Sequence, residues 1–150
     1  MFNKISTPCI GVCSTIYGDD ICRGCHRNFE EIIKWNQLSQ DERLTIQTRL
    51  DNLQNKFSKK YFEITDRSLL IKSLIDFKIN HRNSENNFSL AYKLVKKLGN
   101  KLKAEGIEQY GVSIKYLTEK LTINQILTEI DEDIYKESEE NFNTIIWYID

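Results

Sequence analysis

The sequence predicts an α+β protein with an N-terminal four-cysteine metal knuckle and helical hairpin, followed by a small helix-rich α+β module. Three observations support this fold class. Four cysteines lie within residues 9–25, apolar residues recur at helical spacing in several later segments, and two short segments are rich in β-branched and aromatic residues. We expect two domains, residues 1–59 and residues 60–150, because 150 residues suffice for two small compact units.

Two helices are predicted after the cysteines, and each starts at a capping box. Asn28 is followed three residues later by Glu31, which predicts a short helix over about 29–36. Ser39 and Glu42 have the same spacing, and apolar residues continue at helical intervals, so a longer helix is expected over about 40–58. The two helices would form the hairpin of the first module.

The second module is predicted to combine helices with short strands. Residues 60–64 read as a strand, and Asp66 is expected to cap the helix after it. Helices are predicted over about 67–77, 88–98 and 122–134, and the polar residues 80–87 are expected to form a loop. Residues 106–117 alternate only partly, as a half-buried strand would. Residues 144–149 are β-branched and aromatic, so we expect a strand there that pairs with 60–64.

The cysteines Cys9, Cys13, Cys22 and Cys25 form the pattern most informative about chemistry. Each short pair places two sulfurs on one turn, and the loop between the pairs is long enough to fold back. The N-terminus lacks the apolar run of a signal peptide, so we expect a cytoplasmic protein. In that reducing compartment, clustered cysteines are more typical of thiolate ligands than of disulfides. The sequence therefore predicts one metal centre on four cysteines.

Four thiolates suit either zinc or an iron–sulfur cluster, and geometry alone does not choose between them. Zinc is favoured because a fully ligated ion stabilises a loop-rich segment with few apolar residues of its own. The spacing also differs from both ferredoxin patterns. An iron–sulfur cluster is the alternative, since Gly11 and Gly24 leave backbone amides close to sulfur, and disulfides or free thiols are the third possibility. His26 is expected to be a bystander of this site.

Several motifs of this region together resemble a known family. They are Pro8-Cys9-Ile10-Gly11-Val12-Cys13, Cys22-Arg23-Gly24-Cys25-His26-Arg27, Glu31-Ile32-Ile33-Lys34-Trp35, Ser39 and Glu42-Arg43. This set is similar to the bacterial DUF1289 family over about residues 5–55. The resemblance implies a small cysteine-rich protein of a kind commonly described as predicted iron–sulfur proteins, and it names no reaction. The sequence departs from the family's usual form at Asn28, where threonine is common, and in the loop 14–21, but all four cysteines are kept.

Three further residues of these motifs, Arg27, Trp35 and Arg43, have two alternative roles. In the first, Trp35 packs the short helix onto the knuckle, while the arginines pair with nearby glutamates or neutralise a site of charge about −2. In the second, Arg27 and Trp35 are exposed and form a hot spot for a protein partner, because Trp and Arg dominate interface energies. The packing role is favoured, and the interface role remains open.

Charge and composition argue against several classes of function. The net charge is −1, divided as +2 over residues 1–60 and −3 over residues 61–150, and the lysine-rich stretches are expected to be solvated helix faces. No segment approaches the apolar length of a membrane span. No nucleophile–base pair is visible at an informative spacing, so we expect no enzymatic activity. Aromatic residues of the second module could stack unpaired bases, but its −3 charge opposes a polyanion.

These observations predict a metal-binding, non-enzymatic adaptor that contacts a protein partner. The alternative is an iron–sulfur protein that transfers electrons or senses oxidants. RNA binding is a minor alternative, because nucleic acid partners are opposed by the charge of the second module.

Overall fold

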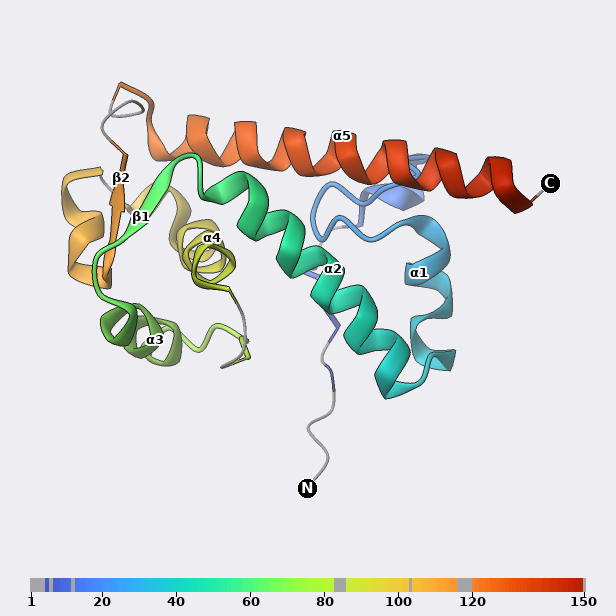
Figure 1. The fold of residues 1–150 in the computed structure, drawn as a ribbon, viewed down its shortest axis with the longest axis horizontal. Helices are drawn as coiled ribbons and strands as arrows, with labels where there is room; N and C mark the ends of the chain where they lie inside the picture. The colour runs from blue at the N-terminus through green and yellow to red at the C-terminus, as the bar shows by residue number, and fades with distance from the viewer. Residues whose placement is uncertain are drawn as a thin grey trace. The chain divides into compact units, whose positions relative to one another are not determined.

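The computed structural model of the chain describes residue 5 and residues 7–11, 13–82, 86–102, 104–115 and 120–149. The chain forms two compact units, one made of Met1–Leu50 together with Asp131–Asp150 and the other of Asp51–Ile130. Both borders fall within long helices, α2 (Gln40–Ser58) and α5 (Ile123–Ile149) (Figure 1). The boundary expected near residue 59 lies inside the second unit, just after the end of α2.

The first unit contains the cysteines and short helices. Its elements are η1 (Ser14–Tyr17), α1 (Phe29–Lys34), η2 (Trp35–Gln37), the first part of α2 and the second part of α5. Both predicted capping boxes are present. The Asn28 side chain accepts from the Glu31 N–H at 2.8 Å while Glu31 accepts from the Asn28 N–H at 3.0 Å, and Ser39 and Glu42 repeat the arrangement at 3.1 and 3.2 Å. The helix starts predicted from these residues are therefore confirmed.

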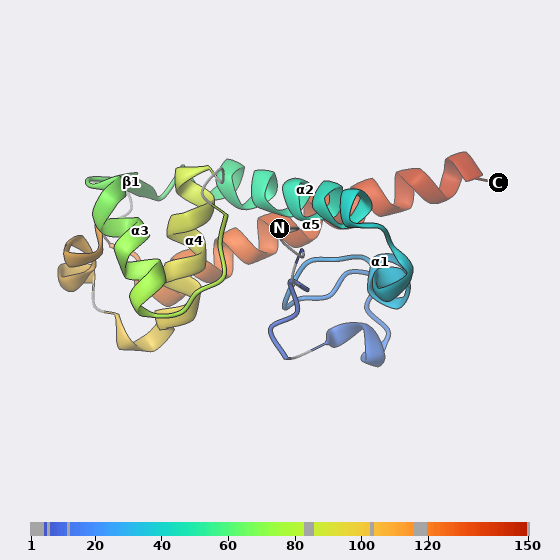
Figure 2. The same ribbon diagram turned by 90° about the horizontal axis from the view of Figure 1, so that it is seen from below.

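The second unit is built on a two-stranded antiparallel sheet. Strand β1 (Phe62–Ile64) pairs with β2 (Val112–Ile114), so that Phe62 faces Ile114 and Ile64 faces Val112. Beside the sheet lie α3 (Arg67–Asp76), α4 (Asn87–Leu98), η3 (Gly99–Lys101) and η4 (Ala104–Tyr110) (Figures 1 and 2). The core of this unit includes fully buried side chains from both strands and both helices, among them Phe62, Leu70, Leu74, Leu90, Leu94 and Val112. The helix-rich α+β class is thus confirmed.

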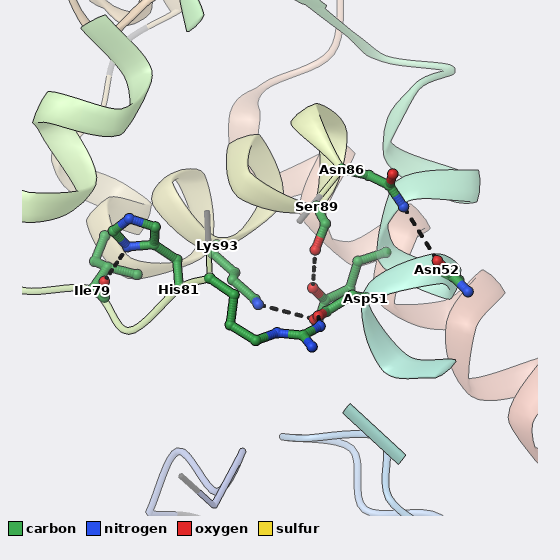
Figure 3. Close-up of polar contacts among 9 residues, drawn as sticks. Asp51, Asn52, Ile79, His81, Asn86, Ser89 and Lys93 are labelled. Atoms are coloured by element: carbon green, nitrogen blue, oxygen red, sulfur yellow. Dashed lines mark hydrogen bonds and ion pairs between the residues drawn. The ribbon is translucent and has the colours of Figure 1, made fainter. Parts of the chain in front are cut away.

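A buried carboxylate anchors α4 and the segment before it to α2 (Figure 3). Asp51 is only 2% exposed, and it accepts a hydrogen bond from Lys93 Nζ at 2.9 Å while its other oxygen pairs with Arg82. Ser89 Oγ donates to the Gln54 side chain at 2.9 Å. Removing one partner of a buried ion pair leaves an uncompensated charge, so this cluster strongly favours one packing of the helices.

One predicted strand is wrong, and another covers only part of its expected range. Residues 144–149 belong to α5, which continues without a break to Ile149, and the partner of β1 is β2. Between residues 106 and 117, a 3-10 helix runs to Tyr110, and the strand covers only Val112–Ile114; residues 116–119 lie outside the described part. The segment 144–149 has strand propensity, but the helix carries no Gly or Pro that would end it earlier.

The remaining predicted helices are confirmed within one or two residues at their starts. The Asp66 side chain accepts from the Leu69 N–H at 3.1 Å and caps α3, as expected. Helix α4 ends at Leu98, and the next residue, Gly99, has a positive φ of 49° that glycine adopts readily. None of the helices in the described ranges is long and apolar enough to cross a membrane.

Candidate metal centre

Cys22 and Cys25 lie on a tight turn that is closed by backbone hydrogen bonds. Cys22 N–H donates to the Arg27 carbonyl at 2.9 Å, and His26 N–H donates to the Cys22 carbonyl at 2.8 Å. His26 adopts a left-handed φ of 65°, which reverses the chain directly after Cys25. An isolated bridge between Ile21 and Asn28 closes the base of the turn. The turn is therefore fixed by its own backbone.

The Cys22 sulfur receives several hydrogen bonds from the backbone. Burial by itself would raise the pKa of this thiol, but backbone hydrogen bonds from Cys25, Ser14 and Gly24 outweigh it, so the pKa of Cys22 is lowered. Cys25 also contributes a side-chain hydrogen bond, which places the two sulfurs next to each other. Backbone N–H groups that converge on one sulfur stabilise a thiolate, which is the form that binds metals.

The Cys25 sulfur is also buried, and it has a cationic neighbour. Burial raises the pKa of Cys25, and the hydrogen bond that Arg27 Nε donates to its sulfur at 3.3 Å acts in the opposite direction. The Arg27 side chain is itself buried. A guanidinium held against a sulfur in this way compensates the negative charge that a thiolate centre would carry.

Cys9 and Cys13 lie on the preceding loop in more open positions. Cys9 is exposed, and its sulfur accepts from the Gly11 N–H at 3.3 Å; Cys13 is half-buried, with its sulfur 2.9 Å from Thr15 Oγ1. The residue after Cys13 connects the two pairs, because Ser14 hydrogen-bonds to the Cys22 sulfur and its Oγ accepts from the Arg23 N–H at 2.8 Å. The loop of the first pair thus touches the turn of the second.

The structure brings Cys22 and Cys25 together, but it does not assemble a complete metal site. Among the residues described, no three His, Cys, Asp or Glu side chains are arranged to hold a metal ion. All four cysteines lie in the described part, and none of them forms a disulfide. Their chemistry fits a thiolate-binding metal, and the hydrogen bonds to Cys22 and the Arg27 contact of Cys25 suit the second pair to that role.

Trp35 is buried between two arginines of the same motif set. The Arg27 and Arg43 guanidinium carbons lie 5.0 and 5.5 Å from the Trp35 ring centroid, and Arg43 Nε donates to the Trp35 carbonyl at 3.0 Å. The three side chains are 4–9% exposed. The exposure that the interface alternative requires is therefore absent, and their burial agrees with the packing alternative. The glutamate pairings expected for these arginines are replaced by the contacts with Trp35, and Glu31 pairs with Arg49 at 2.7 Å.

Helix α5 contributes residues to the cysteine turn that sequence reasoning missed. Asp131 lies 3.6 Å from Nε2 of the buried His26, and the Arg23 guanidinium stacks 4.0 Å above the Tyr135 ring. Ile126, Ile130 and Ile134 recur at helical spacing, and they are buried together with Ser138, which continues the same face. This periodicity is the signal in the sequence that indicates a helix face packed against other residues. His81 takes no part in this site, and its Nδ1 lies 2.9 Å from the Ile79 carbonyl.

Comparison with known proteins gives one match. No curated protein and no solved structure matches the chain. The cysteine loop, α1 and most of α2, which contain every motif discussed above, match a described family. Residues 7–54 match the family "Protein of unknown function (DUF1289)", which confirms over this segment the resemblance that the motifs indicated.

Proposed function

We propose that residues 7–54 form a structural metal-binding module in which Cys9, Cys13, Cys22 and Cys25 hold one zinc ion. The observation that carries the proposal is the convergence of backbone hydrogen bonds on the Cys22 sulfur beside Cys25, with Ser14 of the first pair's loop as one of the donors. Ligation by all four cysteines requires the exposed Cys9 and the half-buried Cys13 to close onto this pair. Their loop has few buried residues to oppose such a movement.

Zinc would supply stability where the chain has little core of its own. None of the described residues before Ile21 is buried, so burial of apolar side chains does not stabilise the loop that carries Cys9 and Cys13. Four thiolates around zinc carry a charge of about −2, which the buried Arg27 would partly neutralise. This arrangement leaves no open coordination position, in keeping with a structural and non-enzymatic role in the reducing cytoplasm.

An iron–sulfur cluster with a redox or oxidant-sensing role is the second candidate. The specific observation in its favour is the number of backbone hydrogen bonds to one sulfur, because such bonds tune the reduction potential of clusters. Zinc remains the better proposal, since the same donors serve a zinc thiolate and the spacing matches neither ferredoxin pattern.

Metal analysis of the anaerobically purified full chain tests the proposal. We expect a colourless protein with one zinc per chain, and cobalt substitution should give the visible spectrum of tetrahedral thiolate coordination. Iron with acid-labile sulfide and a brown colour would identify the cluster instead. A protein that retains neither metal and binds no cobalt would overturn the metal module altogether.

Single cysteine variants test which residues are ligands. Cys9→Ser, Cys13→Ser and Cys22→Ser should each lose most of the bound zinc and lower the thermal midpoint, because a structural zinc contributes on the order of 10 kcal/mol to folding. Ile16→Ser is the matched control, since Ile16 lies between the pairs and is 74% exposed. If Cys9→Ser keeps both metal and midpoint, the four-ligand assignment is wrong even where zinc is found.

We further propose that the module contacts a protein partner, as an adaptor would. Because Arg27, Trp35 and Arg43 are buried, the contact surface must lie elsewhere on this unit. Support comes from exposed apolar side chains on η1 and α1, namely Ile16, Tyr17, Phe29 and Ile33. Cross-linking mass spectrometry in cells expressing the full chain should place a protein cross-link on this surface and lose it in Tyr17→Asp; cross-links confined to residues 51–130 would contradict the adaptor role.

A further inference from the structure

The two compact units carry opposite charges that the linear sequence conceals. Residues 51–130 contain fourteen Lys and Arg against nine Asp and Glu, a net charge of +5, whereas the rest of the chain contains seven against thirteen, a net charge of −6. The division near residue 59 hid this difference because it counted the acidic residues after 130 with the second module. Residues 51–130 thus carry an excess of five basic side chains, which favours an anionic ligand over a cationic one.

Lysines of this unit gather around an aromatic ring at the end of α2. Lys56, Lys59 and Lys60 are exposed, and Phe57 between them is half-exposed. The Nζ atoms of Lys56 and Lys60 lie 5.1 and 5.2 Å from the Phe57 ring centroid, so this ring has a cation at two positions. Both contacts are within the range of a cation–π interaction. We call Lys56, Phe57, Lys59 and Lys60 the Phe57 patch.

The backbone of Lys115 lies next to the turn that follows the patch. Its N–H donates to the Tyr61 carbonyl at 2.9 Å, which places the residue after β2 beside the turn that follows α2 (Figure 1). The Glu129 side chain of α5 accepts from the Tyr61 hydroxyl at 2.7 Å. A further lysine and a carboxylate therefore lie close to the turn after the patch.

We propose that the Phe57 patch binds single-stranded nucleic acid. The lysines contact backbone phosphates, and the accessible part of the Phe57 ring stacks on one base. Stacking requires an unpaired base, which favours single strands over duplexes. Phe62 of β1 cannot stack on a base, because it is fully buried.

Other lysines of the same unit provide matched controls. Lys72 on α3 and Lys97 on α4 are exposed and lie outside the patch. The start of α4 contacts Asn52 and Asn55 of α2, and one turn further on Lys93 reaches Asp51, so α4 runs away from the end of α2 that carries the patch. The Lys72→Glu/Lys97→Glu protein therefore has the same charge as the Lys59→Glu/Lys60→Glu protein but an intact patch.

Fluorescence anisotropy with the full chain and a labelled 15-nucleotide oligouridine tests the proposal. Contacts with about three phosphates predict a roughly 20-fold loss of affinity between 50 and 200 mM KCl. Lys59→Glu/Lys60→Glu should weaken binding at 50 mM by about tenfold or more and flatten the salt dependence, whereas Lys72→Glu/Lys97→Glu should weaken it by less than about threefold. Phe57→Leu should lower affinity about fivefold with an unchanged salt dependence.

Several results would overturn the proposal. They are an absence of saturable binding at 50 mM KCl, an equal loss in the two double variants, or binding of a duplex as tightly as the single strand. Sedimentation velocity without nucleic acid tests whether the patch binds a second copy of the chain instead. A dimer that the Lys59→Glu/Lys60→Glu substitutions dissociate would assign the patch to self-association. Circular dichroism checks that each variant is folded. If the Lys59→Glu/Lys60→Glu protein is unfolded, Lys59→Ala/Lys60→Ala takes its place, and we expect a smaller loss of affinity for the oligouridine.

Discussion

At the scale of single residues, Trp35 is the point where the motifs of the first unit meet. Arg27 connects it to the Cys25 sulfur, and Arg43 connects it to α2 through the Trp35 carbonyl. The indole is therefore enclosed by two flat cations, each of which also donates to a sulfur or a carbonyl oxygen. The motifs of the sequence identify these three residues as candidates. Whether they pack inside the unit or form an interface depends on their burial, and burial depends on contacts between residues that are distant in the sequence.

Replacement of Trp35 measures how strongly this stack stabilises the fold. Trp35→Ala should lower the free energy of unfolding by about 3–5 kcal/mol, because a buried indole leaves a large cavity and two arginines lose their aromatic neighbour. Ile33→Ala, two residues away and 57% exposed, should change it by less than about 0.5 kcal/mol. Urea denaturation followed by circular dichroism gives both values. Equal effects would show that the stack is not a stabilising core.

At the scale of secondary structure, local chemistry predicted where helices begin better than which segments pair. The capping residues Asn28, Ser39 and Asp66 each act within three residues, so their effect is visible in the sequence. The strand expected at 144–149 failed because β-branched propensity is weak and helix continuation from α5 overrides it. The true partner of β1 is a three-residue strand, too short for an alternating pattern to identify.

Gly111 lets the second strand approach the start of α3. It has a φ of 80°, and its carbonyl accepts from the N–H groups of Thr65 and Asp66 at 2.9 and 3.2 Å. A Cβ atom at this position would lie 2.1 Å from the Asp66 carbonyl oxygen and 3.0 Å from the Leu70 nitrogen. Both obstacles are backbone atoms, so the side chains cannot move aside to make room.

We therefore expect Gly111→Ala to lower the free energy of unfolding by about 2–5 kcal/mol, from left-handed strain and the displaced backbone together. Gly99→Ala is the control, because Gly99 also has a positive φ, of 49°, but a Cβ atom added there would meet no other atom within 4 Å. Its cost should be only the conformational strain of a sparsely populated backbone conformation, about 1–3 kcal/mol. Thermal and urea denaturation of the two variants compare them, and a cost at Gly111 no larger than at Gly99 would contradict the close approach.

At the scale of the whole chain, the first unit is assembled from two segments that are distant in the sequence, whereas the second unit is continuous. Residues 131–149 follow the second module in the chain, yet they belong to the unit of the cysteines, and Asp131 and Tyr135 contact the turn of Cys22 and Cys25. Composition could predict an α+β protein with a cysteine module. It could not predict this return of the chain, because a helical pattern indicates which face is buried but not against which partner.

Hydrogen exchange can distinguish the structural division from the linear one. In the Trp35→Ala protein, which weakens the first unit with or without a bound metal, amides of residues 21–50 and 131–143 should lose protection together, because they form one compact unit. Amides of β1, β2, α3 and α4 should keep wild-type protection, while Ile33→Ala serves as the control that changes neither group. The expected border within α5 is near Ile130, where exchange rates should change along one continuous helix. If residues 131–143 instead stay protected together with residues 112–130, the second half of α5 unfolds with the second unit. In that case the division near residue 59 describes the cooperative units of this protein better than the division at residues 50 and 130.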